Sequence, residues 1–189
     1  MKKKIVLFAS GNGSNVENIL IYFKNDSRMS IIEVFTNNSN ANVLKRIVPY
    51  GITGRCFNKD DLNKGIIFKE LKLWNPDLII LAGFLLEIPS SIINFFSNKI
   101  INIHPALLPK YGGKGMYGIN VHKEVKRNNE VKTGITIHYV NENYDTGNVI
   151  FQAEVEIFQS DSLEDISNKV HNLELEYFPR IIESILFKI

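Results

Sequence analysis

Cysteine is nearly absent from this 189-residue sequence, in which Cys56 is the only one. An intramolecular disulfide is therefore impossible, and nothing calls for an oxidising compartment. Long apolar runs are missing too, since no stretch approaches the roughly 18 residues of a membrane span. The lysines at positions 2–4 and the apolar residues after them resemble the start of a signal peptide, but the apolar run stops at Ser10. We therefore expect a cytoplasmic protein.

Charge of one sign is also lacking, because 22 basic residues stand against 20 acidic ones and the formal net charge is +2. A nucleic-acid-binding protein would need a basic face or stripe. The four histidines are scattered, without a His-x-x-x-His pair or a cysteine pair, so no metal site is expected. We predict small-molecule substrates and neither nucleic acid nor membrane as partners. The sequence leaves monomer and homodimer open.

Most of the chain alternates short apolar runs with segments of helical period, a pattern that favours βαβ units and a parallel sheet. The expected strands cover residues 5–8, 31–36, 53–57, 78–82 and 100–104. The expected helices between them cover about 15–24, 41–48, 68–74 and 89–96. At this length and with 44% hydrophobic residues, the chain suits one globular domain over residues 1–189.

From Gly134 the pattern changes to strict alternation of apolar and polar residues, which is typical of an antiparallel strand. A partner strand is expected at 149–157, and a closing helix from about Leu163 to Phe187, capped by Asp161 or Ser162. The predicted fold is a doubly wound α/β sheet of about seven strands. It is mostly parallel, carries helices on both faces and ends in an antiparallel C-terminal edge.

Glycines cluster between the first predicted strand and the first predicted helix, in the sequence SGNGSN at 10–15. Backbone N–H groups at a helix N-terminus favour an anion, and Gly11 and Gly13 let the backbone approach it. The third glycine of a dinucleotide fingerprint is missing, because Val16 stands in its place. The Gly-Lys-Ser/Thr of a P-loop is missing as well. The turn therefore predicts a phosphate on a small metabolite, although Gly, Ser and Asn are common in any such turn.

Asn102 and His104 lie two residues apart on a predicted strand, so their side chains project to the same face. They stand at the carboxyl end of that strand, where open α/β sheets place their sites, and Pro105 restricts His104 to an extended backbone. An amide donor beside an imidazole suits an oxyanion at a tetrahedral carbon. Asp145, in the loop YDTG, is a candidate carboxylate for the same site or an ordinary turn residue.

The other histidines are weaker candidates, because a lone histidine is more often a core or surface residue than a functional one. His122 and His171 fall on predicted helices, where we expect surface or packing roles. His138 faces away from the apolar residues of its strand, which makes it a candidate for lining the site.

Five segments, taken together, resemble the folate-dependent phosphoribosylglycinamide formyltransferase family. They are FASGNGSN (8–15), LAGFLLEI (81–88), NIHPALLPKYGG (102–113), GITIHYVNENYDTGNVI (134–150) and VHNLELEYFP (170–179). The similarity covers essentially the whole chain. The third and fourth segments recur across folate-dependent formyltransferases and hydrolases, so they specify the chemistry, whereas GNGSN helps to specify the acceptor.

The resemblance implies a site for two small molecules, with substrate phosphate binding in the N-terminal half of the domain and folate binding in the C-terminal half. The ribose 5-phosphate of glycinamide ribonucleotide would bind Gly13, Ser14 and Asn15, and Glu174 would orient its glycinamide. The pterin of 10-formyltetrahydrofolate, the co-substrate, would lie against a segment formed by Leu85, Leu86, Glu87 and Ile88. Val140 and Asn141 begin the segment, reaching to Tyr144, that would close over the pterin.

The mechanism implied by the resemblance is a direct transfer in purine synthesis. The substrate amine attacks the formyl carbon, and Asn102 and protonated His104 stabilise the oxyanion. Asp145 favours the imidazolium and helps proton transfer through water. No covalent intermediate on the enzyme and no metal is needed.

Three positions depart from the family pattern. Leu85 and Leu86 stand where many relatives carry Met-Arg. A family arginine that meets the glutamate tail of folate aligns near Asp60, with Lys59 as the candidate substitute. The stretch Gly112 to Gly118 is richer in glycine than the commoner version.

Other readings remain open. A methionyl-tRNA or amino-sugar formyltransferase would use the same chemistry on another acceptor, but the tRNA enzyme carries an extra C-terminal barrel, and the related folate hydrolase an extra N-terminal domain. We expect neither here. A binding protein for a phosphorylated metabolite would need only the GNGSN turn and would leave Asn102, His104 and Asp145 without a common purpose.

Overall fold

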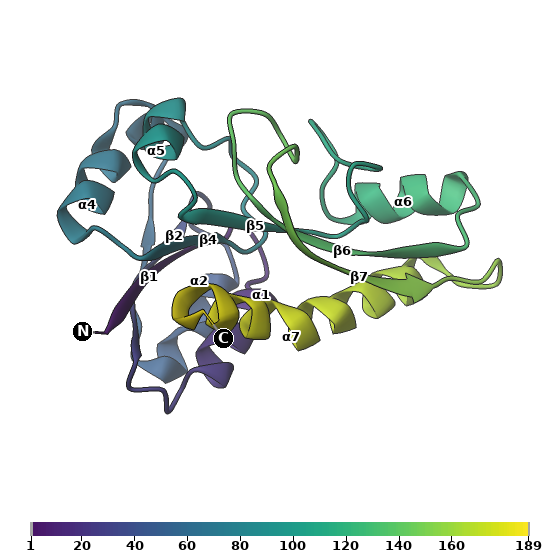
Figure 1. The fold of residues 1–189 in the computed structure, drawn as a ribbon, viewed down its shortest axis with the longest axis horizontal. Helices are drawn as coiled ribbons and strands as arrows, with labels where there is room; N and C mark the ends of the chain where they lie inside the picture. Colours follow the sequence, from purple (N-terminus) through teal and green to yellow (C-terminus); the bar gives the residue numbers. More distant parts are fainter. Residues whose placement is uncertain (1, 189) are drawn as a thin grey trace.

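A computed structural model describes residues 2–188 of the chain and shows one seven-stranded sheet with helices on both faces (Figure 1). The sheet has the strand order β3-β2-β1-β4-β5-β6-β7. Its strands are β1 (Lys3–Phe8), β2 (Met29–Thr36), β3 (Gly54–Cys56), β4 (Leu78–Leu81), β5 (Ile100–His104), β6 (Lys132–Tyr139) and β7 (Val149–Glu156). The first five strands pair in parallel, whereas β6 is antiparallel to both β5 and β7. The predicted fold class is confirmed.

Alternate residues of the central strands serve two separate cores. Ile5 and Leu7 of β1 point into a core shared with the first and last helices, whereas Val6 and Phe8 point into a core under the helices of the other face. The helices are α1 (Ser14–Tyr22), α2 (Val43–Arg46), α3 (Lys59–Asn63), α4 (Ile66–Trp74), α5 (Ser90–Phe95), α6 (Ile119–Arg127) and α7 (Leu163–Phe187), and a 3₁₀ turn covers Val48–Tyr50. Within residues 2–188, no helix combines the length and the apolar character needed to cross a bilayer.

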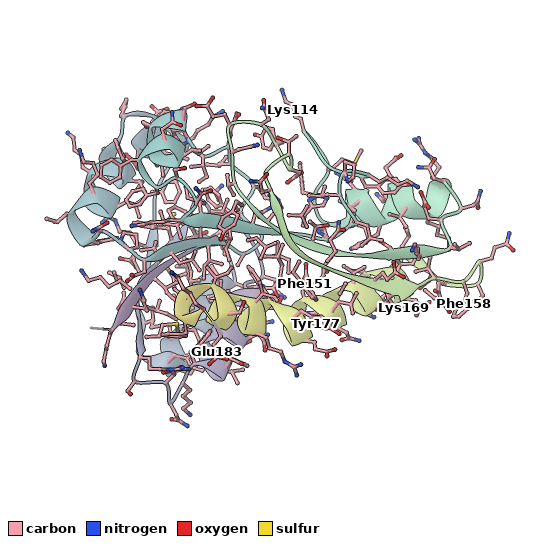
Figure 2. All side chains as sticks on the ribbon, in the orientation of Figure 1. Lys114, Phe151, Phe158, Lys169, Tyr177 and Glu183 are labelled. Carbon is pink, nitrogen blue, oxygen red and sulfur yellow. The ribbon has the colours of Figure 1, made fainter. Side chains whose placement is uncertain are left out.

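The closing helix α7 begins at the expected residue, because the Ser162 side chain accepts from the N–H of Asp165 and that carboxylate accepts from the N–H of Ser162. It runs on past Pro179 to Phe187. Tyr177 of α7 packs against Phe151 of β7 with the ring centroids 5.0 Å apart, which ties the helix to the antiparallel edge of the sheet (Figure 2).

Two expected elements differ from the structure. The helix expected at 41–48 is only α2 followed by the 3₁₀ turn. Pro49 lies in the first turn of this 3₁₀ segment, and Gly51 ends the segment at a φ of 71°. The short helix α3 was not expected, although Asn58 and Asp61 form a capping box at its start. The third strand is also shorter than expected, at Gly54–Cys56.

The carboxyl ends of three parallel strands meet at the point where the order of the sheet reverses. From β1 the chain first builds outward to β2 and β3, and then crosses to β4 and β5 on the other side. Open α/β sheets bind ligands in the crevice at such a point. The GNGSN turn follows β1, the LAGFLLEI segment follows β4, and His104 ends β5, so the topology gathers the sequence motifs at one edge.

Gly134 of β6 lies close against the backbone of Ala153 in β7. A methyl group on it would lie 2.0 Å from the carbonyl oxygen of Ala153 in β7. Only glycine fits in this strand position without moving β7, which carries the end of the Asp145 loop.

We expect Gly134→Ala to lower the free energy of unfolding by about 1–3 kcal/mol, the usual cost of forcing volume into a packed interior. Urea denaturation followed by circular dichroism measures it. Gly11→Ala is the matched control, because a methyl group there meets no atom within 4 Å, and its effect should stay below about 0.5 kcal/mol. Equal losses in the two variants would contradict the steric account.

Candidate active site

One cavity of about 720 Å³ runs across the carboxyl ends of β1, β4 and β5 and is lined by residues from both halves of the chain. Every site residue expected from the sequence lines it. Gly13, Ser14, Asn15 and Glu174 line one part of it, and the residues of the Leu85–Ile88 segment with Val140 and Asn141 line another. Asn102, His104 and Asp145 also line the cavity. Lys59 is not among the lining residues, but Lys114 is.

The glycine-rich turn leaves the first N–H groups of α1 without a side-chain cap. Gly13 precedes the helix at a φ of 76°, and a methyl group on it would lie 2.5 Å from Cβ of Val43, so this position requires glycine. The uncapped N–H groups of the first turn point out of the helix and are free to bind an anion. The Ser10 hydroxyl connects this turn with the segments that follow β2 and β4. It donates to Oδ1 of Asn37 (2.5 Å) and accepts from the N–H of Leu85 (2.9 Å).

Glu174 connects α7 with the glycine-rich turn. One of its carboxylate oxygens accepts from Nδ2 of Asn15 and from Nδ1 of His171, each at 3.0 Å. The hydrogen bond with Glu174 raises the pKa of His171 against the effect of burial. A polar and negatively charged wall therefore faces the space beside the turn, suited to the hydroxyl, amide or amine groups of a ligand.

His122 and His171, for which we expect surface or packing roles, also line the cavity. His122 is 5% exposed, and burial lowers its pKa. The spacing of three residues between His171 and Glu174 on one helix was an available signal for His171. For His122 the sequence held no such signal.

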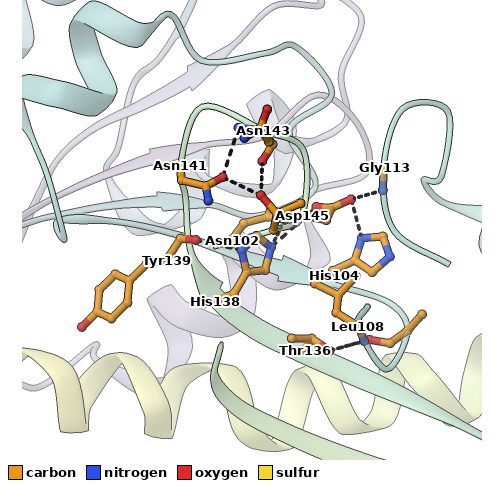
Figure 3. Close-up of polar contacts among 12 residues, drawn as sticks. Asn102, His104, Leu108, Gly113, Thr136, His138, Tyr139, Asn141, Asn143 and Asp145 are labelled. Carbon is orange, nitrogen blue, oxygen red and sulfur yellow. Dashed lines mark hydrogen bonds and ion pairs between the residues drawn. The ribbon is translucent and has the colours of Figure 1, made fainter. Parts of the chain in front are cut away.

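Asn102, His104 and Asp145 come together as the sequence suggested (Figure 3). His104 is 3% exposed; its Nε2 lies 2.8 Å from the carbonyl oxygen of Tyr111 and its Nδ1 lies 3.5 Å from Oδ2 of Asp145. The same Asp145 oxygen accepts from the N–H of Gly113 at 2.9 Å. Since a carbonyl oxygen only accepts, the Nε2 of His104 carries a proton, and its Nδ1 faces the carboxylate.

Burial is the largest influence on the pKa of His104. It lowers the pKa of the imidazole below the ordinary value, while the charge of Asp145 and the Tyr111 carbonyl act in the opposite direction. The balance of these effects favours the neutral form of the free imidazole, whereas the resemblance implies a protonated His104 during the reaction. Burial also favours the neutral acid of Asp145, but His138 and His104, whenever either ring is protonated, and the Gly113 N–H act against burial and lower the pKa of this carboxyl.

A polar cluster behind His104 fixes the turn that follows β5. Thr136, opposite His104 in the strand pairing, donates to the carbonyl of Ala106 (2.7 Å) and accepts from the N–H of Leu108 (3.0 Å). Gln152 of β7 donates to the Thr136 hydroxyl and to the Leu108 carbonyl. Sequence reasoning missed this cluster, because it depends on the register of β6 against both of its neighbours.

The part of the cavity that Leu85, Leu86, Ile88 and Val140 line is mainly apolar. Ile88 is buried in the core of this face, with Leu86 and Val140 packed against that core, whereas Leu85 is 48% exposed although it is a large apolar residue. A flat aromatic ligand could cover such a surface and remove it from water. Among residues 2–188, no group of three or more His, Cys, Asp or Glu side chains is placed to hold a metal ion.

Comparisons with known proteins agree on one family. The model of the formyl transferase family, described as "Formyl transferase", matches residues 3–182. A phosphoribosylglycinamide formyltransferase of Bacillus subtilis is 36% identical over 97% of this chain and 95% of its own length. The chloroplastic enzyme of the same name from Arabidopsis thaliana is 34% identical over 97% of this chain, which spans 65% of that relative's length. The crystal structure of glycinamide ribonucleotide transformylase 1 from Geobacillus kaustophilus superposes with a TM-score of 0.89 at 30% identity, covering 98% of this chain and 100% of that one.

The charge of Asp145 should be measurable at His104. Asp145→Asn removes the largest influence that raises the pKa of His104, so this pKa should fall further below its ordinary value. The amide oxygen can still accept from the Gly113 N–H, which preserves the loop. An NMR titration of the His104 ring measures the shift.

Glu174→Gln is the control for this titration, because Glu174 raises the pKa of His104 least among its neighbours. The control should lower the pKa less than Asp145→Asn does. A His104 pKa that stays constant or rises in Asp145→Asn would contradict the electrostatic account.

Proposed function

The chain belongs to the formyl transferase family, and from that premise we propose that it transfers the formyl group of 10-formyltetrahydrofolate to the amine of glycinamide ribonucleotide. The product is N-formylglycinamide ribonucleotide, an intermediate of purine synthesis. The observation that carries the proposal is that one cavity is lined by the uncapped glycine-rich turn, by the apolar Leu85–Ile88 segment, and by Asn102, His104 and Asp145.

The acceptor would bind at the polar end of the cavity. Its phosphate would receive hydrogen bonds from the uncapped N–H groups of Gly13, Ser14 and Asn15, where the helix dipole also favours a dianion. Glu174, already bonded to Asn15 and His171, would accept from the polar groups of the sugar or the glycinamide. This placement directs the amine of the acceptor along the cavity toward Asn102 and His104.

The formyl donor would bind at the apolar end. Leu85, Leu86 and Ile88 would cover the faces and edges of the pterin, and the backbone of this segment, together with Glu87, would meet its polar atoms. Val140 and Asn141, which follow β6, would close the other side. Because the Ser10 hydroxyl of the glycine-rich turn accepts from the N–H of Leu85, a direct hydrogen bond joins the turn to the Leu85–Ile88 segment.

The transfer needs one attack and two proton movements. The acceptor amine attacks the formyl carbon and forms a tetrahedral alkoxide, which the amide of Asn102 and the Nε2–H of His104 would stabilise. In this structure that N–H donates to Tyr111, so the alkoxide would replace the carbonyl oxygen as its acceptor. The proton lost by the amine passes through water toward Asp145 and His104, and the folate nitrogen gains a proton as the C–N bond breaks. Tetrahydrofolate leaves, and no bond to the enzyme forms.

Asp145 would act through charge and placement. Its carboxylate is held by the Gly113 N–H and faces Nδ1 of His104 at 3.5 Å. If His104 takes up a proton during the reaction, that proton resides on Nδ1 and forms an ion pair with Asp145, which offsets the cost of charging a buried ring.

We further propose that residues 1–189 form one catalytic domain that works in the cytoplasm as a monomer or a homodimer. The lone cysteine, Cys56, is exposed, which suits a reducing compartment.

The acceptor assay tests the function directly. Purified protein should consume 10-formyltetrahydrofolate only when glycinamide ribonucleotide is present, and the dephosphorylated acceptor should be used far less well, because it cannot bind the glycine-rich turn. Absorbance and product analysis by mass spectrometry follow the reaction. Consumption at the same rate without an acceptor would identify a hydrolase and reject the proposal.

His104→Ala should lower kcat by about 10² or more, the typical cost of losing an oxyanion donor or an acid–base group. Thermal unfolding and the KM for both substrates serve as controls, since the fold and the two binding ends should survive the change. Near-normal turnover in a folded variant would remove His104 from the mechanism.

A further inference from the structure

His138 is a buried polar residue of the cavity to which the family resemblance assigns no role. It is 2% exposed and lies in β6 directly opposite Asn102 of β5. Residues opposite each other on antiparallel strands place their side chains on one face with their Cβ atoms about 4.5–5.5 Å apart. A register shift in the pairing of β6 with β7 also falls between Ile137 and His138, and such bulges often redirect a side chain.

The proton position on the His138 ring follows from its contact with the backbone. Nδ1 lies 2.9 Å from the carbonyl oxygen of Tyr139, which can only accept, so Nδ1 carries the proton. In a neutral imidazole the other nitrogen, Nε2, is then an acceptor. His104 has the opposite arrangement, because its Nε2 is the atom that faces a backbone carbonyl, that of Tyr111.

The acceptor nitrogen of His138 faces the amide of Asn102. Nδ2 of Asn102 lies 3.2 Å from Nε2 of His138, so the amide donates one N–H to the ring. With the amide turned over, its carbonyl oxygen would face the lone pair of Nε2, and two acceptors would repel each other. One orientation of the Asn102 amide is therefore favoured, with its second N–H free to act in the cavity.

Asp145 does not compete for this contact while His138 is neutral. Its Oδ1 lies 3.6 Å from Nε2 of His138, beyond hydrogen-bond distance, and both atoms are acceptors. A proton on Nε2 would reverse the situation, because the ring would then donate to Asp145 and could no longer accept from Asn102. The amide of Asn102 thus depends on the tautomer of its neighbour.

We propose that His138 is a positioning residue, which the Tyr139 carbonyl holds in the Nδ1–H tautomer and which in turn orients the Asn102 amide for oxyanion binding. The kinetic part of this inference rests on the proposed formyl transfer, in which Asn102 stabilises the alkoxide. The tautomer itself is a property of the free protein and is testable without substrate.

The first experiment is a ¹⁵N NMR measurement of the histidine ring nitrogens in the free enzyme above pH 7. We expect the Nδ1–H tautomer for His138 and the Nε2–H tautomer for His104, so the two rings should give opposite patterns in one spectrum. Assignment follows from the loss of signals in single variants. An Nε2–H tautomer at His138 would overturn the proposal, whether or not the protein proves to transfer formyl groups.

The second experiment compares His138→Gln with His138→Asn. A glutamine amide can place its oxygen near the former Nε2 and still accept from Asn102, whereas an asparagine amide reaches only the former Nδ1. We expect His138→Gln to keep kcat within about threefold, and His138→Asn to lose about 10- to 100-fold, less than complete loss of an oxyanion donor. The KM for both substrates should change little, since the interaction acts in the transition state.

A purely structural histidine gives a different pattern. It predicts similar losses of thermal stability in both variants and no difference in kcat between them, and that result would overturn the proposal, as would equal losses of kcat. In the double variant Asn102→Ala/His138→Asn, kcat should match that of Asn102→Ala alone, because His138 acts through Asn102. A further loss in the double variant would show an independent role. If the wild type fails the acceptor assay, the proposed function falls while the tautomer result stands.

Discussion

The carboxylate of Asp145 lies next to residues from three separate segments of the site. It accepts from the Gly113 N–H, and its two oxygens face the imidazoles of His104 and His138 at 3.5 and 3.6 Å. Its loop can come this close only because neighbouring glycines lack side chains. A methyl group on Gly147 would lie 1.7 Å from the Tyr139 carbonyl oxygen, and one on Gly112 would lie 3.1 Å from Cβ of Asp145. The chemistry of the cavity therefore depends on how closely the backbone can pack around one buried charge.

Beside that charge, backbone carbonyls favour different tautomers of the His104 and His138 imidazoles. The Tyr111 carbonyl accepts a hydrogen bond from Nε2–H of His104, and the Tyr139 carbonyl accepts one from Nδ1–H of His138. The first ring keeps a lone pair toward Asp145 and can accept a proton beside a carboxylate. The second keeps a lone pair toward Asn102 and orients its amide. Both rings are almost fully buried, so neither depends on solvent for its hydrogen bonds, and the arrangement is set before a substrate arrives.

The sequence was sufficient for the fold class and for placing Asn102 and His104 on one face, because both depend on local pattern, whereas the role of Asp145 rested on the family resemblance. Apolar runs located the central strands, and the two-residue spacing of Asn102 and His104 placed them on one face. The alternation in β6 was read as an antiparallel strand, and it is one, but both faces are buried. Its polar residues Thr136 and His138 face neighbouring polar groups of the site instead of water. Local pattern could not show this, because the partners of Thr136 and His138 lie on β5, on β7 and in loops far away in the sequence.

In the proposed function, the glycine-rich turn binds the phosphate of the acceptor and thereby brings its amine to Asn102 and His104. A crystal structure of the complex with glycinamide ribonucleotide tests it most directly. We expect the phosphate to bind the N–H groups of Gly13, Ser14 and Asn15. The amine should face Asn102 and His104. A phosphate bound elsewhere, or an amine directed away from these two residues, would contradict it.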